Sequence, residues 1–256
     1  TASLEHGTQP FFAMELIEGR PLVTFATETG LDTSERLRLL AEAELGVAKH
    51  KRSFLRVGEE NRPGILLVHD ADQTPAHLVP VARSLHGAGF TVHSPLLNSE
   101  EHEVSSQLEP RWRATLEQIR HGYSLLAGSC HEVYVMGTGL GAALAMLLAE
   151  REKVAGLVLL APAVAPRTSF RMKLLRRLGL LKLHAVRRRL GRHEDQLEAM
   201  QMARDLAGKL KVPVYAAMCD DDPVVRPEAL RTLQRKSKNP RSRFRVFESG
   251  GHDVLA

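Results

Sequence analysis

Short apolar runs alternate with longer amphipathic stretches along most of the chain. The runs at 64–69 and 154–160 are continuously apolar, which is typical of strands buried on both faces of a sheet. The stretch at 111–126 instead repeats its apolar residues at helical spacing. The full pattern predicts strands at 53–57, 64–69, 90–94, 131–136, 154–160, 212–218 and 243–248, and helices at 75–86, 111–126, 139–150 and 227–235. This alternation predicts an α/β fold with a mostly parallel sheet flanked by helices.

Two parts of the chain depart from the alternation. Residues 1–50 form an N-terminal extension, with a predicted strand at 11–19 and a predicted helix at 31–45. The alternation also breaks at about 163–208, where a helical insertion is expected. The predicted organisation is therefore the extension followed by one α/β domain at 51–256 that carries the insertion.

Length and composition set the broad class of protein. The chain has 256 residues, enough for one large α/β domain with a sizeable core. We see neither an apolar run near the roughly 18 residues of a membrane span nor the pattern of a signal peptide. The two cysteines, Cys130 and Cys219, are far apart and match no metal-binding spacing. These features predict a cytoplasmic protein without a metal or cofactor.

Positive charge is concentrated in one segment. Residues 167–192 contain ten Lys or Arg and no Asp or Glu, whereas the rest of the chain carries 25 basic and 30 acidic residues. The net charge of +5 therefore reflects this segment and not a general adaptation to polyanions.

The most informative motif is the glycine-rich turn after the predicted strand at 131–136. It has the sequence Gly137-Thr138-Gly139-Leu140-Gly141 and leads into an apolar helix. A nucleophile elbow has the pattern G-x-S-x-G, with a strained backbone at its central residue. Gly139 stands at that centre and tolerates the strain easily. A dinucleotide-binding turn is the alternative, but the glycine spacing does not match it and this is not the first strand of the alternation.

From about residue 62 to its end, the chain resembles α/β-hydrolases of the carboxylesterase and monoacylglycerol-lipase-like branch. The similar segments are a strand followed by His69-Asp70, a helix at 78–85, Gly89-Phe90-Thr91-Val92 and Pro95-Leu96-Leu97. The resemblance implies an α/β-hydrolase fold, with the insertion at 163–208 as a cap over an acyl pocket.

The same resemblance assigns roles to five positions. Gly139 takes the nucleophile position, where the family has serine. Asp222, followed by Val224-Val225, takes the position of the acid in preference to Asp220 or Asp221, and His252 that of the base. The backbone N–H groups of Leu140 and Ala71 would form the oxyanion hole.

Three departures from the family pattern concern the expected active site. Gly139 has no hydroxyl. Asp70 replaces the glycine of a His-Gly pair, which places a carboxylate beside a hole built for developing negative charge. Residues 98–102 contain no glycine, although the family has a glycine-rich turn there. A single change would suggest a laboratory knock-out, whereas three suggest natural loss of the chemistry.

Thr138 and Cys130 are the other possible nucleophiles, and neither is a good candidate. The Thr138 side chain is expected to point away from the pocket, and Cys130 precedes the strand, at the wrong end of the sheet.

The chain also ends four residues after His252, where the family has a last helix that covers the sheet. Either that helix is missing from this sequence or residues 4–45 replace it.

Two functional hypotheses follow. The first is a pseudoenzyme that binds an acyl or other apolar small molecule. The second is a serine-type esterase or lipase that has lost its nucleophile at Gly139, or that retains weak hydrolysis through Asp222 and His252.

The basic segment at 167–192 admits three interpretations. It can be a solvated cap helix, a helix that lies on an anionic membrane surface, or a nucleic-acid-binding element. Nucleic acid is the least favoured partner, because Phe170 is the segment's only aromatic residue for stacking on bases.

Residues 5–45 weakly resemble the hinge segment of serine/threonine protein kinases, on Met14-Glu15 and Gly19 through Leu22. No glycine-rich loop, strand lysine, H-R-D or D-F-G motif accompanies them. We therefore expect no kinase activity from this segment.

Overall fold

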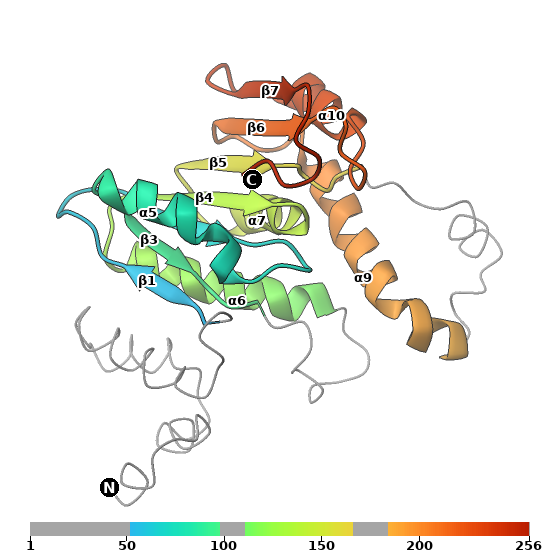
Figure 1. Ribbon diagram of the computed structural model, residues 1–256, viewed down its shortest axis with the longest axis horizontal. Helices are drawn as coiled ribbons and strands as arrows, with labels where there is room; N and C mark the ends of the chain where they lie inside the picture. Colours follow the sequence, from blue (N-terminus) through green and yellow to red (C-terminus); the bar gives the residue numbers. More distant parts are fainter. Residues whose placement is uncertain (1–51, 98–110, 166–183, 256) are drawn as a thin grey trace, which may run out of the picture.

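The computed structural model describes residues 52–97, 111–165 and 184–255 (Figure 1). Several predictions concern residues outside these ranges: the strand at 11–19, the helix at 31–45, the kinase-like residues at 5–45, the loop at 98–102 and most of the basic segment at 167–192.

One seven-stranded sheet forms the centre of the molecule, in the order β1-β3-β2-β4-β5-β6-β7. Every neighbouring pair is parallel except β1 with β3. The strands are β1 (Phe54–Arg56), β2 (Gly64–Val68), β3 (Thr91–Ser94), β4 (Val133–Thr138), β5 (Gly156–Leu160), β6 (Val214–Cys219) and β7 (Arg243–Phe247). The predicted mostly parallel α/β fold is confirmed, and each predicted strand is found within three residues of its expected bounds.

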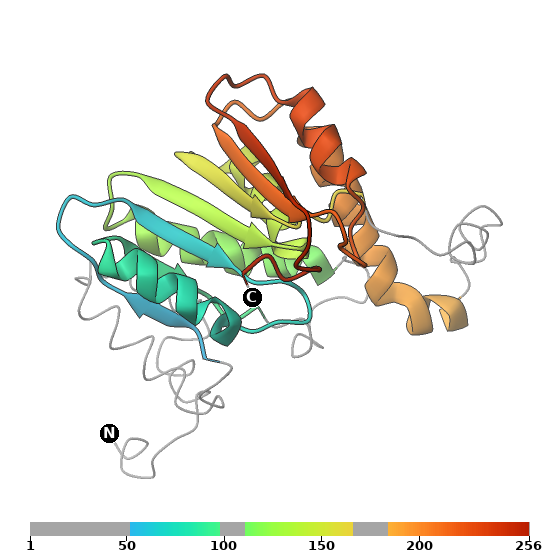
Figure 2. The same ribbon diagram turned by 45° about the horizontal axis from the view of Figure 1, so that its top comes forward.

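Helices cover both faces of this sheet (Figures 1 and 2). They are η2 (Pro75–Leu78), α5 (Val79–Gly87), α6 (Arg111–Ala127), α7 (Leu140–Arg151), α9 (His184–Leu206) and α10 (Glu228–Lys236). The helix predicted at 75–86 is in fact a short 3-10 turn followed by α5. Pro80 lies in the first turn of α5, where its missing N–H costs no hydrogen bond.

Alternate residues of the strands feed two separate cores. Leu66 and Val68 of β2 pack with α6, α7 and α10 on one face. Ile65 and Leu67 of the same strand pack with Leu78 and α5 on the other. Side chains of a strand point to opposite faces in turn, so a strand that is apolar throughout must be covered twice. The continuous apolar run seen in the sequence has this cause.

The insertion between β5 and β6 contains α9, which packs against α7 (Figure 1). Ala199 and Ala203 are fully buried at this contact, and their small side chains let the helices approach closely. That the insertion caps a pocket remains a prediction. Among the described helices, none is long and apolar enough to cross a bilayer.

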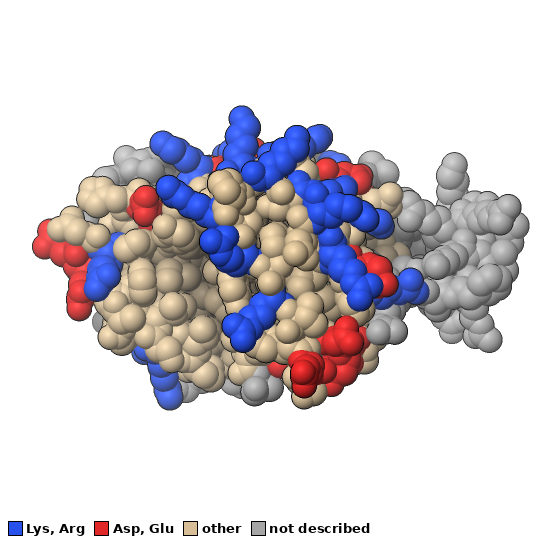
Figure 3. Space-filling model, turned by 90° about the horizontal axis from the view of Figure 1, so that it is seen from above, with Lys and Arg blue, Asp and Glu red and all other residues tan. Residues whose placement is uncertain are grey.

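A second basic region lies along the β7 edge of the sheet. Residues 226–245 contain eight Lys or Arg and one acidic residue. Arg241, Arg243 and Arg245 are exposed there, and Figure 3 shows Lys and Arg gathered over this end of the molecule. Charged side chains on an edge strand oppose pairing with other strands, and this accounts for the arginines of β7.

Gly141 allows α7 to pack directly on β2. A Cβ at this position would lie 2.5 Å from the carbonyl oxygens of both Val68 and His69. These are backbone atoms that cannot move aside, so Gly141→Ala is expected to lower the free energy of unfolding by about 2–3 kcal/mol. Urea denaturation measures this loss. The control is Gly87→Ala at the exposed end of α5, where nothing lies within 4 Å, with an expected change within about 1 kcal/mol. Equal losses in both variants would contradict this account of the packing.

Candidate active site

The turn between β4 and α7 has the conformation expected of a nucleophile elbow. Gly139 has φ 53° and ψ −119°, in a region that side chains rarely adopt. Its N–H donates to the Leu160 carbonyl at 2.9 Å, and its carbonyl accepts from the Ala163 N–H at 3.1 Å. A Cβ on Gly137 would lie 2.5 Å from the Gly141 carbonyl oxygen. The turn is thus fixed by its hydrogen bonds and needs glycine for close approach.

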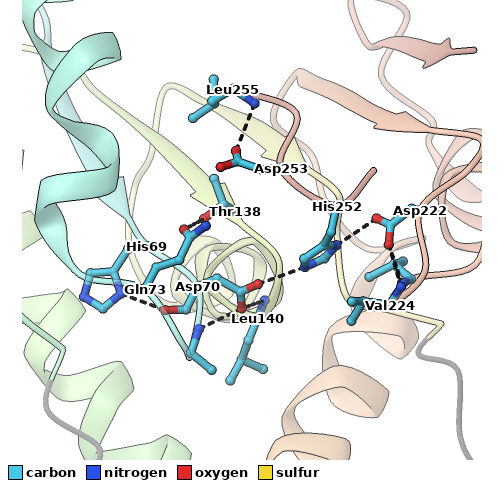
Figure 4. Close-up of polar contacts among 12 residues, drawn as sticks. His69, Asp70, Gln73, Thr138, Leu140, Asp222, Val224, His252, Asp253 and Leu255 are labelled. Carbon is cyan, nitrogen blue, oxygen red and sulfur yellow. Dashed lines mark hydrogen bonds and ion pairs between the residues drawn. The ribbon is translucent and has the colours of Figure 1, made fainter. Parts of the chain in front are cut away.

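The Asp70 carboxylate fills the space in front of this turn (Figure 4). Asp70 follows β2, and its Oδ1 accepts the Ala71 N–H at 2.7 Å and the Leu140 N–H at 2.8 Å. A Cβ built on Gly139 would overlap Asp70 Oδ2. The carboxylate therefore occupies the place of a side chain at position 139. It also uses both N–H groups that the sequence suggested as oxyanion donors.

His252 lies between two carboxylates. Its Nε2 is 3.0 Å from Asp70 Oδ2, and its Nδ1 is 2.8 Å from Asp222 Oδ2 (Figure 4). Asp222 is fully buried, and its Oδ1 accepts the N–H groups of Val224 and Val225 at 2.7 and 2.9 Å. The structure thus brings together the predicted acid and base, and adds a second acid on the opposite side of the imidazole.

The loop after β7 is shaped so that His252 reaches this position. Gly250 and Gly251 have φ values of 142° and 68°, which favour glycine. The Gly251 N–H donates to Asp221 Oδ1 at 2.9 Å. Asp221, which the sequence ranked below Asp222 for the acid, therefore fixes the histidine loop, while Asp222 contacts the imidazole itself.

His69 fixes the backbone of Asp70 through a hydrogen bond to its carbonyl, a role that the sequence did not predict. The Leu97 N–H donates to His69 Nε2 at 3.2 Å, which makes Nε2 an acceptor. The proton is then on Nδ1, which lies 2.8 Å from the Asp70 carbonyl and donates to it. Burial lowers the pKa of His69, in keeping with this neutral form. The signal in the sequence was a histidine directly after a buried strand.

His252 and Asp70 form an ion pair that shifts the pKa of both groups. The hydrogen bond to Asp70 is the largest influence that raises the pKa of His252, and with a further contribution from Asp222 it outweighs burial to give about 9. Burial alone would raise the pKa of Asp70, but hydrogen bonds from His252, Leu140 and Ala71 together lower it. At neutral pH the centre therefore holds an imidazolium between carboxylates.

The two other candidate nucleophiles lie elsewhere. The Thr138 hydroxyl donates to Gln73 Oε1 at 3.4 Å. Cys130 lies at the opposite end of β2, where a Cβ on Gly64 would be 3.1 Å from its sulfur. Burial raises the pKa of the Cys130 thiol, which disfavours the reactive thiolate. Neither residue is placed to work with His252.

Within the described ranges, no three His, Cys, Asp or Glu side chains are arranged to hold a metal ion. The groups that the described residues bring to this centre are two carboxylates, one imidazole and two backbone N–H donors.

Comparison with known proteins agrees with the fold. No protein-family profile matches the chain. A stretch of 107 residues is 31% identical to the thermostable monoacylglycerol lipase of Bacillus sp. (strain H-257), and it covers 41% of this chain and 43% of the lipase. Among solved structures, the chain is similar to a metagenome-derived lipolytic enzyme, with a TM-score of 0.66 and 16% identity over 80% of this chain and 91% of the enzyme.

The Paleococcus ferrophilus monoacylglycerol lipase is a second similar structure, with a TM-score of 0.63 and 19% identity over 79% of this chain and 91% of the lipase. The chain thus has the α/β-hydrolase fold, and its relatives include lipolytic enzymes. At these identities the structures support the fold, while the chemistry must be argued from the site itself.

Proposed function

We propose that this α/β-hydrolase-fold chain, similar to lipases and esterases, is a pseudoenzyme toward carboxylic esters and binds an acyl or other apolar small molecule. The observation that carries the loss of hydrolysis is the position of Asp70. Its carboxylate lies against Gly139 and accepts both backbone N–H groups of the expected oxyanion hole.

Acyl transfer by a serine-type centre needs three things, and each is compromised here. The attacking hydroxyl is missing, because position 139 is glycine. The donors that would hold an oxyanion are already bound to a full negative charge on Asp70. The general base must be neutral to accept a proton, but the two carboxylates raise the pKa of His252 to about 9. An ester would have to displace Asp70 before any step could begin.

The lipolytic relatives support the ligand class, because their names point to glycerol esters of fatty acids. We propose that an apolar ligand binds near the elbow and α9, with the insertion over it. The basic segment at 167–192 would then offer its charges to an anionic membrane surface, in preference to nucleic acid.

The wild-type chain is expected to hydrolyse p-nitrophenyl butyrate no faster than its His252→Ala variant at pH 7.5, because a carboxylate, Asp70, faces His252 in place of the hydroxyl that attacks an ester. Release of p-nitrophenol measures this. Binding is tested separately by calorimetric titration with 1-decanoylglycerol, for which we expect saturable heat without turnover. Hydrolysis that disappears in His252→Ala would overturn the pseudoenzyme proposal, and the absence of any binding heat would overturn the ligand proposal.

A second candidate function is weak hydrolysis in which His252 activates water directly. The retained 2.8 Å contact between His252 and Asp222 favours it. This activity requires neutral His252, so it should rise with pH through about 9. A rate that rises in this way and is absent in His252→Ala would select this alternative.

A further inference from the structure

We propose that Asp70 is a nucleophile for alkyl electrophiles: its Oδ2 displaces a leaving group from a saturated carbon, and His252 then directs water to hydrolyse the resulting aspartyl ester. This activity goes beyond ligand binding and uses the same centre. Its substrate class is a primary alkyl halide or a compound with a comparable leaving group.

The two oxygens of Asp70 are held differently, which suits this chemistry. Oδ1 is fixed by the N–H groups of Ala71 and Leu140, whereas Oδ2 lies beside Gly139 and contacts the His252 imidazole. The side chain keeps 17% of its surface exposed, so that a small molecule can approach. Because Oδ1 fills the donor pair, the carbonyl oxygen of an ester substrate finds no stabilisation there. A saturated carbon needs none, since its leaving group departs with the bonding electrons.

In the first step a bond forms between Oδ2 and the alkyl carbon. The bond from that carbon to the halogen breaks, and halide leaves with the electron pair. The product is an ester of Asp70 in which Oδ1 has become the carbonyl oxygen. That oxygen already accepts the N–H groups of Ala71 and Leu140 at 2.7 and 2.8 Å. The protein's own ester therefore forms inside a ready oxyanion hole.

In the second step His252 takes a proton from water, and the hydroxide attacks Cγ of Asp70. Negative charge collects on Oδ1, where the two N–H groups stabilise it. When this intermediate collapses, the bond between Cγ and Oδ2 breaks, and the departing alkoxide takes the proton from His252. The Asp70 carboxyl group is then regenerated with one oxygen from water and transfers its proton to His252, which restores the resting imidazolium. Overall, an alkyl halide and water become an alcohol and a hydrogen halide.

The first step of the reaction converts the His252 imidazolium into the neutral base that the second step needs. In the resting protein the hydrogen bond to Asp70 is the largest influence that keeps the pKa of His252 high. Alkylation removes the negative charge of Asp70, which lowers that pKa, so the imidazolium releases its Nε2 proton to solvent and becomes able to accept one from water. Asp222 stays bound to Nδ1 throughout and orients the ring.

The test incubates the full chain with 1-bromobutane and locates any butyl group by peptide mass spectrometry. In His252→Gln, which keeps a polar side chain but lacks the base, we expect one butyl group on the peptide with Asp70, because the ester cannot be hydrolysed. Adding Asp70→Asn should abolish the label. Adding Asp72→Asn, a change at a nearby exposed carboxylate, should leave it unchanged. A thermal melt of each variant checks that it is folded.

The wild-type chain gives an independent measurement without any substitution. One turnover in ¹⁸O-labelled water should release bromide, place the label in Asp70 and leave it out of the butanol. Label in the first butanol instead, or butyl found only on Cys130, or none on Asp70 in His252→Gln, would each overturn the proposal. Such a result would leave the pseudoenzyme proposal standing, since that proposal is decided by ester hydrolysis and glycerol-ester binding.

Discussion

Joint replacement of Gly139 by Ser and Asp70 by Gly is expected to create hydrolysis of p-nitrophenyl butyrate about 10³-fold above the wild-type chain. Gly139→Ser alone is expected to remain inactive. The double variant places a hydroxyl at the elbow and empties the donor pair of Ala71 and Leu140. It also removes the carboxylate that holds His252 in its protonated form.

The single variant fails for a steric reason. The Cβ of a serine at 139 would overlap Asp70 Oδ2, and the backbone there has φ 53°. Either the new side chain or the Asp70 carboxylate must leave its position, in addition to about 1–3 kcal/mol of backbone strain. Asp70→Gly alone also stays inactive, because it supplies no nucleophile. Activity therefore depends on both substitutions together.

The matched control combines Gly139→Ser with Asp72→Gly, which removes a neighbouring carboxylate but leaves Asp70 in place. We expect no gain in this variant. Adding His252→Ala to the active double variant should return the initial rate to the wild-type level. If Gly139→Ser alone proved as active as the double variant, Asp70 would not occupy the centre in solution.

The second large effect is a loss of stability at alkaline pH. His252 has a pKa of about 9 in the folded chain and the ordinary 6.5 when unfolded. The folded state therefore binds the proton more tightly. Its contribution is complete below about pH 6.5 and is lost as the pH rises through about 9. We expect the free energy of unfolding to fall by about 1–2 kcal/mol between pH 6.5 and 10, since partial exposure of His252 to solvent weakens the effect.

Two other groups make the free energy of unfolding decrease as the pH falls. The pKa of Asp70 is lowered by folding, so its contribution is present above about pH 4 and is lost as the pH falls further. Burial lowers the pKa of His93 to about 4, which also costs stability as the pH falls below 6.5. Urea denaturation from about pH 2.5 to 10 records both the acid and the alkaline loss of stability. In Asp70→Asn the alkaline loss should become smaller, because only Asp222 then raises the pKa of His252, while the His93 contribution stays. An unchanged alkaline slope would contradict the ion pair.

The sequence was sufficient for the centre of the sheet because β2 and β5 are continuous apolar runs, and burial on both faces leaves such runs little other choice. It also placed Asp222 and His252 at the ends of β6 and β7, where parallel strands bring their loops to one edge of the sheet. Their 2.8 Å contact agrees with that placement. Their catalytic roles remain predictions.

The position of the Asp70 side chain was beyond the sequence. It depends on residues 70 positions away at Leu140 and 182 positions away at His252. From sequence, Asp70 was a charge unfavourably placed beside an oxyanion hole. In the structure it enters the hole and uses its donors. This also changes the meaning of Gly139, because the missing side chain is what gives the carboxylate its space.

The basic edge at 226–245 was predictable in part. Residues 229–245 contain seven Lys or Arg and no Asp or Glu, and the two-residue repeat of a strand places Arg243 and Arg245 on one face. Only the structure shows that this strand, β7, is the edge of the sheet.

Whether the Asp70 carboxylate lies between Gly139 and His252 in solution is tested by an NMR titration of the His252 imidazole in the wild-type chain and in Asp70→Asn. Comparison with His252→Gln identifies its resonance. If Asp70 occupies the centre, the wild-type pKa is near 9 and Asp70→Asn lowers it, because the largest influence that raises it is gone. A wild-type pKa near 6.5, unchanged by Asp70→Asn, would show that the carboxylate does not face His252 and would contradict the account.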